Sequence, residues 1–141
     1  MSCYVVDASV VVKWFIPEVH SDAAVQLLEG GHSLLAPDLL LPEVGNVLWK
    51  KIRRHELSES SARSIFQNLT SKSLQIIGTP TLLKSALGIA TKFDRSFYDS
   101  LYLAAAVFHD CVLATADDKL CRALRGTTLS SHVQCLSQPT T

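Results

Sequence analysis

The sequence predicts a three-layer α/β/α domain with a central, mainly parallel sheet of four to five short strands. The first observation is that short apolar runs alternate with longer helix-like segments, the order found in parallel sheets covered on both faces. The second is the composition: 48% of the 141 residues are hydrophobic and 18% are charged, which suits a compact core rather than a disordered chain. We assign residues 1–136 to a single domain and expect 137–141 to be a disordered tail.

Each expected strand is a short, mostly apolar run. The runs are 3–7, 33–36, 74–77, 112–115 and 133–136, the last expected at a sheet edge. In a parallel sheet covered by helices, ligands bind beyond the carboxyl ends of the strands. Asp7 and Asp117 fall at or just past two of these ends, so the pattern alone predicts that two acids converge there.

Helices are expected between these strands, at about 8–15, 21–29, 38–54, 58–71, 80–92, 98–109 and 119–124. Pro17 stops the first helix and Gly30–Gly31 end the second. The potential N-caps are Ser21 or Asp22, Asp38 and Ser58. The run 101–108 has Tyr102 as its one side chain with a polar group, so that helix is expected to be buried all round.

The 13 basic and 13 acidic residues cancel, so contact with nucleic acid would need local basic patches. The densest patch is 50–55, with a lesser one at Lys119, Arg122 and Arg125. Cations at 50–55 also suit the end of a helix, where the helix dipole favours positive charge. Both interpretations of this patch stay open.

The four cysteines, Cys3, Cys111, Cys121 and Cys135, form no C-x-x-C motif. We therefore expect small buried hydrophobic side chains rather than zinc ligands or disulfides. The sequence has no charged-then-apolar leader and no apolar stretch of the roughly 18 residues that a membrane span needs. A cytoplasmic protein without membrane contact is the resulting expectation.

Four acids stand in four separate segments, at positions where a buried carboxylate lowers stability. Asp7 ends the first strand, and Glu43 interrupts the apolar face of the third helix. Asp99 opens the apolar sixth helix, and Asp117 follows the fourth strand. Gathering several carboxylates is unfavourable because like charges oppose each other's ionisation. If these four converge, a hard divalent cation such as Mg2+ or Mn2+ is the simplest compensation.

Each acid also has an ordinary explanation. Asp7 and Asp117 could be helix N-caps, and Asp99 could favour a helix N-terminus. Glu43 could lie at the solvated edge of its helix. Three polar residues are candidates for supporting roles: Ser9, Asn46 one turn after Glu43, and Thr115.

Four stretches of the chain resemble the PIN-domain family, and most closely the VapC-type toxins of bacterial toxin–antitoxin pairs. They are Val6-Asp7-Ala8-Ser9-Val10 continuing to Lys13-Trp14-Phe15, Pro42-Glu43-Val44-Gly45-Asn46-Val47-Leu48, Tyr98-Asp99-Ser100-Leu101-Tyr102-Leu103-Ala104, and Thr115-Ala116-Asp117. Their order and separations make the resemblance specific, and it covers nearly the whole chain.

The resemblance implies a four-acid site for Mg2+ or Mn2+ at Asp7, Glu43, Asp99 and Asp117, with Asp118 as an alternative for the last. It also implies an endoribonuclease that cuts tRNA or rRNA and leaves 5′-phosphate and 3′-hydroxyl ends. The protein would be a homodimer, neutralised by a small cognate antitoxin. A PIN-like binding module without catalysis, for RNA or protein, is the alternative.

Two other protein classes, a phosphatase and a phospho-receiver domain, fit the positions of the acids less well. A phosphatase of the haloacid-dehalogenase type typically has a second Asp two residues after the first, where this chain has Ser9. A phospho-receiver domain needs an acidic pair before its central Asp, and the chain order does not supply one.

Overall fold

The computed structural model describes residues 2–137 and contains one five-stranded, fully parallel sheet. Its strands are β1 (Cys3–Val6), β2 (Ser33–Pro37), β3 (Leu74–Ile77), β4 (Val112–Thr115) and β5 (Val133–Cys135), arranged in the order β3-β2-β1-β4-β5. The predicted fold class and the edge position of the last strand are confirmed. Most of the predicted tail, 138–141, lies outside the described residues.

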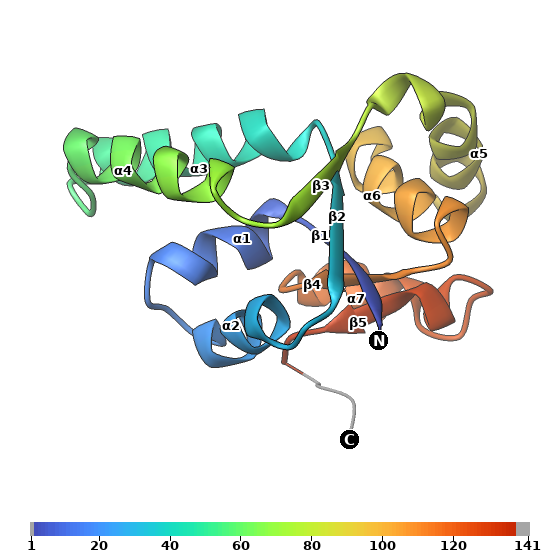
Figure 1. The fold of residues 1–141 in the computed structure, drawn as a ribbon. Coiled ribbons are helices and arrows are strands. Elements are labelled where there is room, and N and C mark those ends of the chain that lie inside the picture. Colours follow the sequence, from blue (N-terminus) through green and yellow to red (C-terminus); the bar gives the residue numbers. More distant parts are fainter. Residues whose placement is uncertain (1, 138–141) are drawn as a thin grey trace.

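Helices cover both faces of the sheet, which Figure 1 shows nearly edge-on. The four helices on one face are α1 (Ala8–Phe15), α2 (Ser21–Glu29), α3 (Leu40–Arg53) and α4 (Glu59–Thr70). The three on the other are α5 (Leu83–Phe93), α6 (Phe97–Phe108) and α7 (Asp118–Leu124). Short 3-10 turns lie at Thr79–Thr81 and Ser130–His132. Each layer of helices buries its own apolar core against the sheet, as parallel strands buried on both faces require. Within residues 2–137, no helix is long and apolar enough to cross a membrane.

From β1 the chain adds β2 and β3 on one side, and it then returns to add β4 and β5 on the other side of β1. The connections from β1 to β2 and β3 run along one face, whereas those from β3 to β4 and β5 run along the other. β1 and β4 are nevertheless neighbours, with Val6 opposite Ala114. The segments that follow these two strands therefore diverge to opposite faces, which creates the crevice in which open α/β sheets bind ligands.

Several predicted helix ends are confirmed and others are wrong. Ser58 caps α4 by accepting a hydrogen bond from the Ser61 amide. Asp38 does not cap α3, which begins at Leu40. The carboxylate of Asp38 instead accepts a hydrogen bond from the Thr79 amide. The residue before α2 is His20, in a left-handed conformation, so neither Ser21 nor Asp22 is its N-cap.

The prediction that the α6 helix is buried all round is wrong at its carboxyl end. Leu101 through Ala106 are buried, but Val107 and Phe108 are 44% and 67% exposed. An apolar run does not show where a helix leaves the core, because that depends on how far the covering helices extend.

The prediction of unpaired cysteines is also wrong, because the structure contains the disulfides Cys3–Cys111 and Cys121–Cys135. The first pair meets because β1 and β4 are paired in register, with Tyr4 opposite Val112. The second pair joins α7 to the edge strand β5. Both pairings depend on tertiary neighbours far apart in sequence, which cysteine spacing does not reveal.

Candidate functional site

The four acids singled out from the sequence line one pocket, of about 160 Å3, beyond the carboxyl ends of β1 and β4. Asp7 and Asp117 follow these strands and cap α1 and α7. Glu43 comes from the first turn of α3, and Asp99 from the first turn of α6. The remaining lining residues are Ala8, Ser9, Tyr102, Leu113 and Leu120. The ordinary capping role of Asp7 and Asp117 is therefore real, but it places both carboxylates in the same pocket.

Asp7 is the acid held by the most hydrogen bonds. Its Oδ1 accepts from the Ser9 hydroxyl at 2.5 Å and from the Val10 amide at 3.2 Å, and its Oδ2 accepts from the Thr115 hydroxyl at 2.5 Å. Desolvation raises the pKa of Asp7 to about 6, and the charge of Glu43 acts in the same direction. The three hydrogen bonds lower that pKa but do not offset burial.

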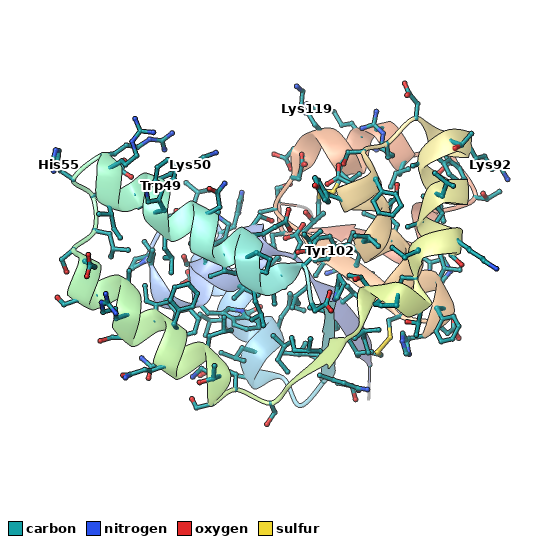
Figure 2. All side chains as sticks on the ribbon, turned by 90° about the horizontal axis from the view of Figure 1, so that it is seen from above. Trp49, Lys50, His55, Lys92, Tyr102 and Lys119 are labelled. Atoms are coloured by element: carbon teal, nitrogen blue, oxygen red, sulfur yellow. A yellow bond between two sulfur atoms is a disulfide. The ribbon has the colours of Figure 1, made fainter. Side chains whose placement is uncertain are left out.

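Glu43 is held from across the pocket by Tyr102, whose hydroxyl donates to Glu43 Oε1 at 2.5 Å. Desolvation raises the pKa of Glu43, the Tyr102 hydrogen bond lowers it, and the charge of Asp99 raises it. Figure 2 shows Tyr102 between α3, which carries Trp49 and Lys50, and the opposite side of the molecule, which carries Lys119.

Asp99 and Asp117 complete the crowded set. Desolvation and the neighbouring charge of Asp117 raise the pKa of Asp99, whereas Ser96 and Arg95 lower it. Asp117 holds the first turn of α7 by accepting from the Leu120 amide. Asp118 instead accepts a hydrogen bond from the Ser137 hydroxyl at 2.8 Å and is not among the lining residues. Of the two neighbouring acids, Asp117 is the one that belongs to this pocket.

Two of the three expected supporting residues contact the acids. Ser9 bonds to Asp7 and accepts from the Ala116 amide, which links the segments after β1 and β4. Thr115 is fully buried and accepts from the Asp117 amide while it donates to Asp7. Asn46 is exposed on α3, and Tyr102 donates to Glu43 from α6.

Tyr102 is the site residue that sequence reasoning missed. It lies one turn after Asp99 on α6 and is the lone side chain with a polar group in the 101–108 run. A polar group at an otherwise buried position, one helical turn from a candidate acid, was the available signal.

The donor set of this pocket fits a hard divalent cation. Every polar side chain that lines it offers oxygen: four carboxylates and the hydroxyls of Ser9 and Tyr102. Among residues 2–137, no three His, Cys, Asp or Glu side chains form a ready-made metal cage.

The PIN-domain family matches residues 4–125, and the chain belongs to that family. It is similar to Ribonuclease VapC3 of Pyrobaculum aerophilum, with 34% identity over 118 residues that cover 82% of this chain and 90% of that protein.

Solved structures share the fold. The crystal structure of PAE2754 from Pyrobaculum aerophilum has a TM-score of 0.70 and 26% identity, covering 96% of this chain and 85% of that one. A toxin–antitoxin complex from Klebsiella pneumoniae has a TM-score of 0.64 and 14% identity, covering 96% and 99%. VapBC2 from Rickettsia felis, bound to a promoter DNA fragment, has a TM-score of 0.66 and 14% identity, covering 94% and 98%.

Proposed function

We propose that this protein is a divalent-metal-dependent endoribonuclease that hydrolyses RNA phosphodiester bonds through Asp7, Glu43, Asp99 and Asp117. The observation that carries the proposal is the convergence of four carboxylates from four segments on one pocket without a lysine or arginine among its lining residues. Such a set is electrostatically unfavourable by itself and becomes favourable around a dication. The similarity to a protein named as a ribonuclease supports RNA as the substrate class.

The four carboxylates would hold Mg2+, or Mn2+ as a substitute. When bound, such an ion makes water a stronger nucleophile and neutralises charge on the reacting phosphate. Ser9 and Thr115 hold the Asp7 carboxylate in one orientation, and Tyr102 fixes Glu43 relative to α6. Hydrogen bonds of this kind orient metal ligands and commonly matter nearly as much as the ligands themselves.

The products would carry 5′-phosphate and 3′-hydroxyl ends, with tRNA or rRNA as the target class. We further propose a cytoplasmic homodimer that is neutralised by a cognate antitoxin protein. The motif resemblance to VapC-type toxins supports this regulation. The exposed apolar side chains Leu87, Tyr98 and Phe108 on α5 and α6 supply surface that a second copy would cover.

The test is cleavage of purified total RNA by the wild type and by Asp99→Asn, each with Mg2+ and with EDTA. We expect discrete fragments only from the wild type with Mg2+. Asp22→Asn is the matched control, because Asp22 is an exposed acid in the first turn of α2, outside the pocket. Full activity of the wild type after exhaustive EDTA treatment would refute metal dependence.

A second measurement distinguishes the metal-dependent nuclease from a binding module without catalysis. Calorimetric titration with Mn2+ should show binding to the wild type that Asp99→Asn weakens in parallel with cleavage. RNA binding without cleavage, and without Mn2+ binding, would favour the binding module.

A further inference from the structure

A second pocket, of about 460 Å3, adjoins the acidic one between α1 and α3. The two pockets share Ala8 and Ser9 in their walls. Their electrostatics are opposite, because four cationic side chains line the second pocket against one carboxylate. The cations are Lys13, Lys50, Lys51 and Arg54, and the carboxylate belongs to Glu18.

Glu18 lies between two of these cations. Its Oε1 is 3.3 Å from Lys13 Nζ, and its Oε2 is 3.5 Å from Lys51 Nζ. The lysines come from different helices, α1 and α3, and their side chains are only 11% and 20% exposed. Two ammonium groups thus converge, away from most of the solvent, on the two oxygens of Glu18; Lys51 Nζ also lies 4.0 Å from Glu56 Oε2.

The dipole of α3 does not account for this arrangement. It explains why cations gather in the last turn of that helix, at Lys50 and Lys51. The dipole of α1 favours Lys13 in the same way, because Lys13 lies in the last turn of that helix. Neither dipole requires the two ammonium groups to face one carboxylate, as they do here. The geometry is that of an anion-binding site in which a carboxylate of the chain stands as the anion.

We propose that this pocket binds a backbone phosphate of RNA next to the scissile one, and that the phosphate displaces Glu18 from Lys13 and Lys51. The assignment rests on the proposed function: Ala8 and Ser9 line both pockets, so an RNA chain bound at the acidic pocket would pass beside the basic one. A phosphodiester has the charge of a carboxylate and presents its oxygens to the same donors. A chain entering the acidic pocket would meet negative charge, which the adjacent cations offset.

Displacement of Glu18 requires little change in the chain. Its backbone amide donates to Ser21 Oγ at 2.9 Å, so the loop is held independently of the side chain. The Glu18 carboxylate is one-third exposed, so it can turn to solvent when a phosphate takes its place. Glu18 therefore acts as a competitor for the site and lowers RNA affinity.

The experiment measures RNA binding separately from cleavage. All variants carry Asp99→Asn, and the probe is a fluorescein-labelled, mixed-sequence single-stranded 12-mer RNA followed by anisotropy across a salt series in Mg2+. Lys51→Gln should weaken binding about 3- to 10-fold and make the salt slope shallower by about 0.7, the value for one phosphate contact on a single strand. Glu18→Gln should tighten binding by a similar factor. Lys84→Gln, an exposed lysine on α5, is the matched control and should change neither quantity.

The outcomes separate this inference from the proposed function, which wild-type cleavage tests independently. Unchanged slopes in Lys51→Gln, or weaker binding in Glu18→Gln, would overturn the phosphate site even if the wild type cuts RNA. Failure of the 12-mer to bind would also overturn it. Binding of a polyglutamate peptide in place of RNA would identify a docking site for an acidic polypeptide and would overturn it as well.

Discussion

In metal-free buffer, Asp7 should make the protein less stable as the pH rises. Burial raises the pKa of its carboxyl from an ordinary 3.8 to about 6 in the folded state. Between these values the folded protein keeps a proton that the unfolded chain has lost, so the free energy of unfolding falls with rising pH and levels off above the folded pKa. A difference of about two pKa units, at 1.36 kcal/mol each, corresponds to roughly 3 kcal/mol. Glu43 and Asp99 have raised pKa values and act in the same direction.

Asp7→Asn isolates this contribution, because an amide of nearly the same size carries no charge at any of these pH values. Urea unfolding of both proteins in EDTA at pH 4 and pH 7.5, followed by circular dichroism, measures the free energies. The wild type should lose about 2.4 kcal/mol more than Asp7→Asn between the two pH values, because at pH 4 the unfolded carboxyl is already partly ionised. Equal losses in both proteins would show that the carboxylate is not desolvated and would refute the reasoning. Saturating Mg2+ should shrink the difference if the ion binds at Asp7.

Three further results are expected. Asp99→Asn should abolish cleavage yet raise the melting temperature in EDTA by relieving repulsion; a lower melting temperature there would contradict the crowded-acid interpretation. Tyr102→Phe should reduce cleavage about 10- to 100-fold through loss of the hydrogen bond to Glu43, measured as initial rates at fixed Mg2+; a rate within two-fold of wild type would argue against that role. Cys135→Ser opens the disulfide to Cys121, which spans 14 residues, and should cost about 3 kcal/mol of unfolding free energy in urea titrations. In dithiothreitol the variant and the wild type should have equal free energies of unfolding. A difference that persists there would show that the substitution acts through packing rather than through the disulfide.

The sequence predicted the order of elements because that order depends on local signals. Short apolar runs between helix-like segments predict parallel strands, and an acid after a strand lies at the edge where ligands bind. Asp7 and Asp117 follow two strands that turn out to be neighbours. The strand order itself is not local, and it is what makes these two ends the centre of the site.

The errors concern contacts that tertiary packing decides. The hydroxyl of Tyr102 on α6 donates to Glu43, a contact that spacing along α3 does not reveal. A role for Asn46 toward Glu43 or a ligand stays a prediction. The helix spacing fixes which residues share a face, but the packing of α6 on the opposite side of the pocket decides which one reaches the carboxylate. Cys3 and Cys111 were assigned as unpaired because only the register of β1 against β4 brings them together.

The bond between Thr115 and Asp7 joins two residues 108 positions apart, so its two partners leave the ribosome at very different times. A growing chain that ends before β4 has Asp7, Glu43 and Asp99 but not the strand that fixes the first of them. Its acids therefore remain an unassembled set until β4 has been made. Any activity that depends on their joint geometry begins only after that strand has paired with β1, which separates in time the synthesis of the first acid from its use.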